Sequence, residues 1–148
     1  DRFTICLEMG HPEPEVELEI LFAHKAGDPL ESIEPVASVE AWRGACEQVR
    51  DITVSRDVAL YMLRLVEQTR SHPEIELGVS TRGALSLFRA SQARALIQSR
   101  SYVSPEDVQS MARPVLAHRL VLAAEARYGG RSAASLVDAL VAESALPL

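Results

Sequence analysis

Residues 78–87 read Gly-Val-Ser-Thr-Arg-Gly-Ala-Leu-Ser-Leu, which predicts a turn and then a capped helix with an arginine in its first turn. Ser80 or Thr81 can accept hydrogen bonds from backbone N–H groups that lack a partner within the helix. The helix macrodipole mildly disfavours a cation at Arg82, yet the guanidinium group and the helix N-terminus together suit a bound phosphate. The spacing alone leaves two interpretations open: a surface arginine on a capped helix, or an arginine that binds phosphate.

Amphipathic helices are predicted on both sides of this turn. Upstream, Ser55 can cap a helix over residues 55–71. Its apolar stripe, the clearest in the chain, consists of Val58, Met62, Leu65, Val66 and Thr69. Downstream, a long helix is expected over residues 81–99. The side chains of this helix that we expect to point inward are Ala84, Leu85, Phe88, Ala95 and Leu96.

The C-terminal third shows further helix starts and stops. Ser104 precedes Pro and two acidic residues, which predicts a helix over residues 105–112. Pro114 is expected to interrupt it, because proline lacks an N–H group and restricts the residue before it. Residues 128–130, Tyr-Gly-Gly, read as a stop, and Ser132 can cap a last short helix.

The first forty-nine residues read differently. Residues 3–9 alternate apolar and polar side chains, which predicts a β-strand. Alone, such a strand leaves its backbone unpaired, so we expect it to be poorly ordered or paired to another copy. A helix is predicted over residues 13–24, a long loop over 25–38 and a second helix over 39–49. Trp42 lies among apolar neighbours at helical spacing, so we interpret it as a core residue.

Composition narrows the class of protein. The 148 residues are 47% hydrophobic but 5% aromatic, which favours a helical domain built on Leu, Val and Ala. A net charge of −6 argues against a general nucleic-acid binder or a binder of anionic membranes. No apolar run approaches the ~20 residues that a membrane helix needs, and no signal segment is present, so a cytoplasmic location is expected.

The cysteines and histidines do not predict a metal site. Cys6 and Cys46 lack CxxC spacing, and we expect both to be buried, reduced thiols. No pair of histidines shows a ligand spacing such as HxxxH. The histidines are His11, His24, His72 and His118.

Three motifs, in order along the chain, resemble the MoxR family of AAA+ ATPases. Residues 78–87 match a G-x-S-x-R-x-x-x-x-L pattern that opens a lid-domain helix in that family. Residues 1–3, Asp-Arg-Phe, resemble the segment after the arginine-finger region, which enters the last core strand. Residues 115–120, Val-Leu-Ala-His-Arg-Leu, resemble the V-L-x-H-R-L near the end of the lid. The resemblance covers residues 1–128 and fades in the tail.

The resemblance implies a mainly α fold, a helical lid-type bundle preceded by one β-strand and a helix left over from the α/β AAA+ core. Residues 1–26 would be that C-terminal remnant of the core, 27–38 a linker, and 39–148 the α-helical lid domain. On this interpretation, the strand over residues 3–9 is the last one of a parallel sheet whose other strands lie outside the chain.

The resemblance also implies a function for the parent protein, which would bind and hydrolyse ATP with Mg²⁺. Arg82 would be the second sensor, contacting the γ-phosphate beside Ser80 and Thr81, and Arg2 the candidate arginine finger. Whether Arg82 reaches its own nucleotide or a neighbour's stays open. The sequence contains no G-x-x-x-x-G-K-[ST] loop and no strand ending in paired acids. We therefore expect this chain alone to bind no ATP or Mg²⁺ and to be inactive.

The family further implies neighbouring subunits of a homo-oligomeric ring, a hexamer. It also implies a chaperone or activation role toward a client protein, one with a von Willebrand A-type domain. No nucleic acid and no membrane insertion are expected.

Two alternatives from other classes stay open. Short capped helices with tight turns could form a helix–turn–helix DNA-binding module, although Thr81 and Arg82 are the only recognition-type residues at a helix start. The domain could also be a non-catalytic helical adaptor. Binding to a DNA duplex at low salt would identify the first alternative, and partner contacts that do not depend on nucleotide would identify the second.

Overall fold

The computed structural model describes residues 2–146, and its contacts divide the chain into two compact units. One unit combines Asp1–Cys6 with Cys46–Leu148, and the other is Leu7–Ala45. The limits of these units differ from the predicted domains, whose boundaries stay a prediction.

The smaller unit contains helical segments that begin at recognisable caps. Helix α1 spans Pro14–Ala26 and begins with proline, which suits the first helical position. The 3₁₀ helix η1, Pro29–Ser32, follows Asp28, whose Oδ1 accepts a hydrogen bond from the Leu30 N–H group at 3.0 Å. Helix α2, Val39–Asp51, starts in this unit, and no residue of α2, which the structure describes in full, is buried.

Two sequence-based expectations about burial are therefore wrong. The Trp42 side chain is 69% exposed, and no other residue of α2, which the structure describes in full, is buried either. Cys6 and Cys46 are free thiols, as expected, but both are exposed rather than buried. Among the described residues, no group of three His, Cys, Asp or Glu side chains could hold a metal ion.

The N-terminal segment does not form the expected strand. Across residues 2–13, all of them described, the backbone has no strand or helix. Its polar groups instead bond to the end of the bundle: the Cys6 N–H group donates to the Pro114 carbonyl oxygen at 2.8 Å. A strand requires a neighbouring strand to pair with. The backbone of residues 3–6 instead has its hydrogen-bond partners at the end of a helix and on two side chains.

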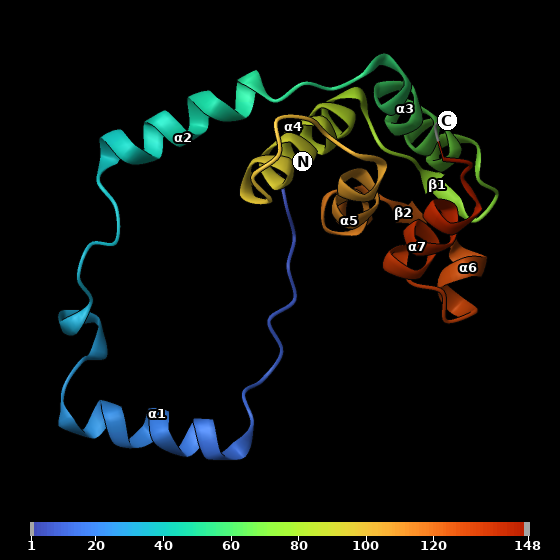
Figure 1. The fold of residues 1–148 in the computed structure, drawn as a ribbon. Helices are drawn as coiled ribbons and strands as arrows, with labels where there is room; N and C mark the ends of the chain where they lie inside the picture. The colour runs from blue at the N-terminus through green and yellow to red at the C-terminus, as the bar shows by residue number, and fades with distance from the viewer. Residues whose placement is uncertain (1, 147–148) are drawn as a thin grey trace. The chain divides into compact units, whose positions relative to one another are not determined.

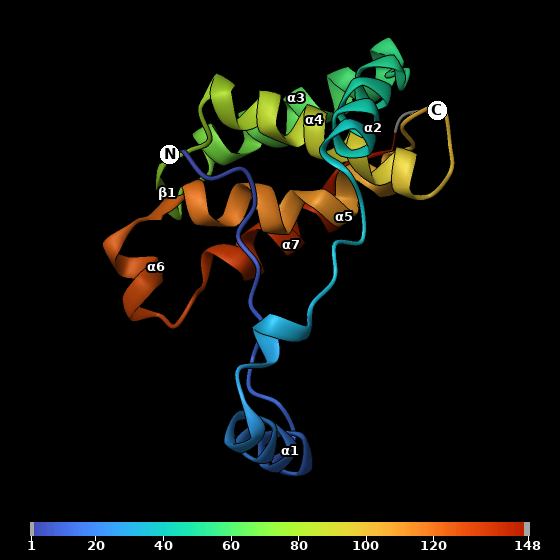
Figure 2. The ribbon, with the colours of Figure 1, turned by 90° about the vertical axis from the view of Figure 1, so that its left-hand side faces the viewer.

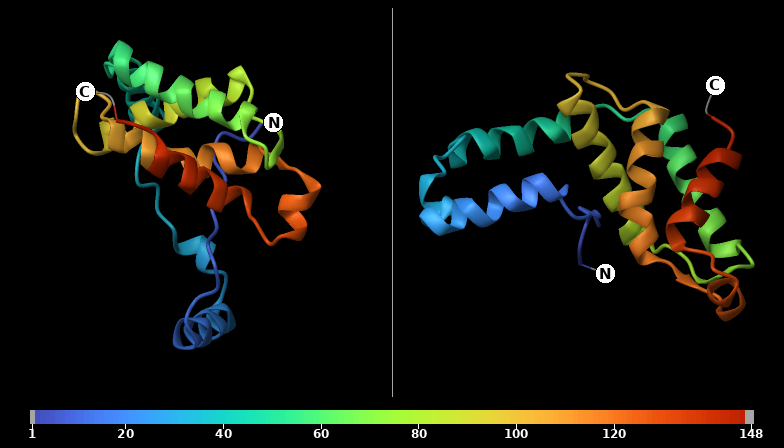
Figure 3. Two further views of the ribbon diagram at one scale, coloured as in Figure 1. Left: turned by 90° about the vertical axis from the view of Figure 1, so that its right-hand side faces the viewer. Right: turned by 90° about the horizontal axis from the view of Figure 1, so that it is seen from below.

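A bundle of four helices forms the larger unit: α3, Arg56–Ser71; α4, Thr81–Ile97; α5, Pro105–Leu116; and α7, Ala133–Glu143. Figures 1 and 2 show these helices together, and Figure 3 shows α4 beside α5 and α3 beside α7. The predicted mainly helical class is confirmed. In the described part of the chain, no helix is both long enough and apolar enough to span a membrane.

Smaller elements that the sequence did not predict close one end of the bundle. Strand β1, Ile75–Leu77, pairs antiparallel with β2, Val121–Leu122. The 3₁₀ helix η2, Ala117–Arg119, precedes β2, and the short helix α6, Ala124–Tyr128, follows it. This pairing ties the α3–α4 connection to the chain that leaves α5 and thereby fixes the turn that carries residues 78–80.

The core confirms most of the predicted apolar stripes. Every member of the α3 stripe is buried, and Leu65 is 1% exposed. On α4 the prediction is wrong at Leu85, which is 54% exposed, because Leu87 faces the core instead and is 0% exposed. Helix α5 also runs through Pro114 to Leu116, so the expected interruption does not occur. Pro114 removes the hydrogen bond that an N–H group at this position would donate to the Ser110 carbonyl, and the α-helix ends two residues later.

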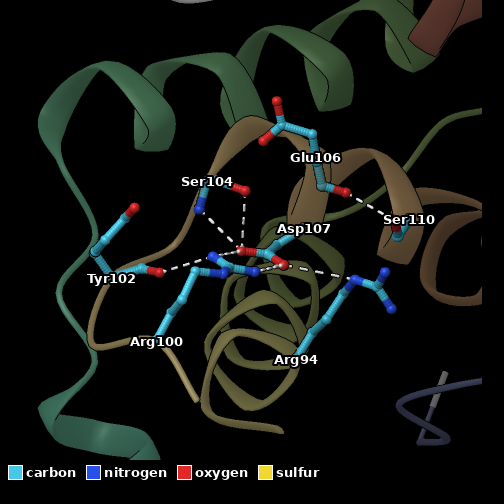
Figure 4. A network of polar contacts seen from close by, with 7 residues as sticks. All are labelled: Arg94, Arg100, Tyr102, Ser104, Glu106, Asp107 and Ser110. Atoms are coloured by element: carbon cyan, nitrogen blue, oxygen red, sulfur yellow. Dashed lines mark hydrogen bonds and ion pairs between the residues drawn. The ribbon is translucent and has the colours of Figure 1, made fainter. Parts of the chain in front are cut away.

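A buried carboxylate joins the start of α5 to the end of α4 (Figure 4). Asp107, whose side chain is 2% exposed, accepts hydrogen bonds from Arg100 at 2.6 and 2.7 Å and from the Ser104 N–H group at 2.9 Å. Arg94 Nε lies 3.5 Å from its Oδ1. Burial alone would raise the pKa of Asp107, but the hydrogen bonds from Arg100 and Ser104 outweigh burial and hold this pKa below its usual value.

The lowered pKa of Asp107 predicts a pH-dependent contribution to stability. A carboxylate with a lowered folded-state pKa stabilises the fold above its usual pKa of about 3.9, and this contribution is lost as pH falls through the folded-state value. We expect Asp107→Asn to lower the free energy of unfolding by about 2 kcal/mol at pH 7. This deficit should shrink as the pH falls below 4 in urea unfolding experiments.

The matched control is Asp138→Asn. Asp138 pairs with Arg113 at 3.2 Å on the surface, where the two side chains are 52% and 55% exposed. Exposed ion pairs contribute little, so this variant should unfold almost like the unmodified protein. An Asp107→Asn deficit that stayed constant from pH 7 to pH 3 would contradict the charged role of Asp107.

Candidate functional site

The turn before α4 is fixed to the end of α3 through its backbone. Val79, which is 1% exposed, donates its N–H group to Thr69 Oγ1 at 3.0 Å and accepts a hydrogen bond from Arg70 Nε at 2.8 Å. A Cβ atom at Gly78 would lie 2.6 Å from the Thr69 carbonyl oxygen, so a larger residue would displace the turn. The turn is therefore a fixed base from which α4 begins.

Ser80, rather than Thr81, caps α4. Its Oγ accepts the Gly83 N–H group at 3.4 Å, and its carbonyl accepts the Ala84 N–H group at 3.1 Å. Thr81 is the first helical residue and is exposed. Arg82 follows it, also exposed, so its guanidinium group extends from the first turn of a helix whose position is set by buried contacts.

A pocket of about 320 Å³ brings Arg82 together with three other arginines. Arg2 comes from the N-terminal segment, Arg89 from α4 two turns after Arg82, and Arg119 from η2. The remaining lining residues are Thr4, Leu85 and Ser86. No acidic side chain is among the described residues that line this arginine pocket.

The arginines of the pocket differ in their ion pairs from arginines elsewhere in the protein. Within the described part of the chain, Arg2, Arg82 and Arg89 form no ion pair, whereas Arg94 and Arg100 share Asp107. Guanidinium groups present planar, paired donors that match phosphate and carboxylate oxygens. The pocket therefore suits a multiply charged anion, and the described residues that line it include no histidine, cysteine or carboxylate for proton transfer.

Arg119 is partly buried, whereas the other three arginines that line the pocket are exposed. Its guanidinium donates to the Phe3 carbonyl oxygen at 2.6 Å, to the Thr4 carbonyl oxygen at 3.2 Å and to the Val115 carbonyl oxygen. Burial lowers the pKa of Arg119 from its usual value. A Cβ atom at Gly83 would lie 2.3 Å from Val79 Cγ1 and 3.1 Å from Arg119 Cδ, so the glycine in the first turn of α4 makes room for both side chains.

The structure thus brings together two of the predicted site residues, Arg2 and Arg82, which are far apart in the sequence. Ser80 supports the site as a cap, and Thr81 is not among the pocket-lining residues. The roles assigned to all four stay a prediction. Arg89 and Arg119 also line the pocket, and neither was among the residues assigned to the site from the sequence. The seven-residue spacing of Arg82 and Arg89, which puts both on one helix face, was the available signal.

Comparisons with known proteins agree with the fold and the motifs. Residues 67–140 match the family model of the AAA lid domain. The chain is 35% identical over 148 residues to the uncharacterized protein YeaC of Bacillus subtilis, covering 100% of this chain and 46% of YeaC. It is 28% identical over 156 residues to the chaperone MoxR1 of Mycobacterium tuberculosis, covering 99% of this chain and 41% of MoxR1.

A crystal structure of a candidate ATPase from Cytophaga hutchinsonii has a similar fold. It superposes with a TM-score of 0.88 at 25% identity, over 98% of this chain and 47% of that one. The chain therefore spans less than half the length of each of these relatives. From the lid-domain match, the MoxR relatives and the agreement in fold, we conclude that the chain belongs to the MoxR-like AAA+ ATPases and carries their lid domain.

Proposed function

We propose that this chain supplies the nucleotide-sensing lid of an ATPase, with Arg82 as the second sensor that contacts the γ-phosphate of ATP. The observation that carries this proposal is the arginine pocket, in which Arg82 extends from a rigidly held helix start beside Arg2 and Arg89. Negative charge spreads over the transferring phosphate in the transition state, and fixed guanidinium donors stabilise it without having to reorganise.

Arg2 has a related role in this proposal. It lines the same pocket as Arg82, so both guanidinium groups can approach one phosphate chain. As an arginine finger, Arg2 would act on the ATP of a neighbouring subunit.

We also propose that the whole protein works as a ring-forming chaperone or activation factor, supported by its family and by the relative named chaperone MoxR1. The subunit number, the client protein and the cytoplasmic location stay predictions. The deciding measurement for the sensor role is ATP hydrolysis by the full-length protein carrying Arg82→Ala. Unchanged hydrolysis would remove Arg82 from the mechanism.

Arg89 should affect substrate binding more than turnover. It lines the pocket two turns further along α4 and is exposed, and an exposed charge contributes about 0.2–1 kcal/mol to a contact. We expect Arg89→Ala to raise KM for ATP about 2- to 5-fold and to leave kcat nearly unchanged. The control is Arg127→Ala on α6, whose side chain is also exposed and is not part of the pocket. A large fall in kcat with Arg89→Ala would instead place Arg89 at the reacting phosphate.

A further inference from the structure

We propose that Arg119 is a positioning residue that clamps the N-terminal segment, residues 2–6, onto the lid and so holds Arg2 in the arginine pocket beside Arg82. The inference rests on the proposed function for its catalytic consequence. The clamp itself rests on contacts within the chain.

The N-terminal segment is held by its backbone. Arg119 donates to the carbonyl oxygens of Phe3 at 2.6 Å and Thr4 at 3.2 Å. His118 Nε2 lies 3.2 Å from the same Phe3 oxygen, and the Cys6 N–H group donates to the Pro114 carbonyl at 2.8 Å. Phe3, Thr4 and Cys6 are therefore held by hydrogen bonds to the end of α5 and to η2.

Apolar burial contributes little to this attachment. The Phe3 side chain is 80% exposed and the Ile5 side chain is 41% exposed. Without substantial burial, the position of the segment depends on its hydrogen bonds, and those to a charged donor are the strong ones. Removing Arg119 should therefore release the segment, and Arg2 with it.

Arg119 is itself held by two helices, α4 and α5. It donates to the Val115 carbonyl oxygen at the end of α5 and to Ser86 Oγ of α4 at 3.3 Å. Its Cδ packs over Gly83 in the first turn of α4, the turn that also carries Arg82. One side chain thus connects the N-terminal segment, α4 and α5.

These contacts distinguish Arg119 from the other pocket arginines, because its donors are used within the protein. Its Nη1 and Nη2 groups donate to carbonyl and hydroxyl oxygens of the protein, at Phe3, Thr4 and Ser86. Arg2, Arg82 and Arg89 form no ion pair within the described residues. We therefore assign phosphate contact to these three and positioning to Arg119.

The first test is a double-mutant cycle on ATP hydrolysis by the full-length protein, with Arg2→Ala, Arg119→Ala and the double variant. If Arg119 acts through Arg2, each single variant should lower kcat by a similar factor, with a smaller change in KM. The double variant should then be no slower than the slower single one, because the two residues form one unit. Arg119→Lys, which keeps the charge but loses the planar fork, should restore only part of the activity. Effects that multiply in the double variant would overturn the positioning role.

The second test does not need nucleotide. Hydrogen exchange of the Cys6 amide, followed in the full-length protein, should be at least about 10-fold faster in Arg119→Ala than in the unmodified protein. The matched control is Arg89→Ala, which removes a pocket arginine that forms no hydrogen bond or ion pair with residues 2–6 and should leave this exchange unchanged. Unchanged exchange in Arg119→Ala would overturn the clamp.

The two proposals can fail separately. If Arg82→Ala leaves hydrolysis unchanged while Arg119→Ala still releases the Cys6 amide, the sensor role is wrong and the clamp is supported. If Arg82→Ala abolishes hydrolysis while Cys6 exchange is unaffected by Arg119→Ala, the sensor role stands and the clamp is wrong.

Discussion

Replacing Arg82 by alanine is expected to lower kcat for ATP hydrolysis by about 10²- to 10³-fold, with a smaller change in KM. An interaction that strengthens as charge develops on the transferring phosphate affects kcat, whereas one equally strong in ground and transition states affects KM. Arg82 suits the first kind of interaction because Val79 is fixed to Thr69 and Arg70, so the helix start that carries Arg82 is already in place before reaction.

Two further variants sharpen this prediction. Arg82→Lys keeps the charge but cannot present paired planar donors, so most of the loss should persist. Arg127→Ala, on the surface of α6 and away from the pocket, should hydrolyse ATP at the normal rate. If Arg82→Ala raised KM alone, Arg82 would be a binding residue and not a sensor of the transition state.

Replacing Leu65 by alanine is expected to lower the free energy of unfolding by about 2–5 kcal/mol. Leu65 is 1% exposed and belongs to the core cluster that joins α3 to α4 and α5. Truncation loses the transfer free energy of the buried atoms and leaves a cavity that close-packed neighbours fill only in part.

Leu63 on the same helix provides the matched control. Its side chain is 47% exposed, and surface substitutions usually change stability by less than about 0.5 kcal/mol. Urea unfolding should therefore separate Leu65→Ala clearly from Leu63→Ala. Equal midpoints for the two variants would contradict the packing of α3.

Local sequence signals were sufficient for the bundle helices. Ser55, Ser80 and Ser132 each cap the helix that follows them, with the Oγ atom accepting a backbone N–H group. The spacing of apolar residues on α3 predicted its buried face. These features depend on neighbours within about one helical turn, which a single sequence contains in full.

The errors occurred where a residue's surroundings are set by distant parts of the chain. Trp42 has the sequence pattern of a core residue, but its exposure depends on what packs against α2. Leu85 was expected in the core, yet the α4–α5 contact favours Leu87 and leaves Leu85 at the edge of the arginine pocket. Residues 3–9 alternate like a strand, and no strand lies beside them among the described residues.

The arginine pocket, too, could be predicted only in part from the sequence. Arg82 was predicted from its own motif, because the cap and the turn are local. The meeting of Arg2 with Arg82 depends on contacts between segments 115 residues apart, which no spacing rule reports. Arg119 lay within a recognised motif, but its contacts with Phe3 and Thr4 became visible only in the fold.

The distance along the chain between Thr4 and Arg119 also determines when the pocket can form during synthesis. These residues are 115 positions apart, and ribosomes add roughly 5–20 residues each second. Arg2 therefore leaves the ribosome roughly 6–23 s before its anchor does. During that interval α3 and α4 can pair, but the N-terminal segment has no place to attach. A nascent chain can thus pair α3 with α4 before its arginine pocket is complete.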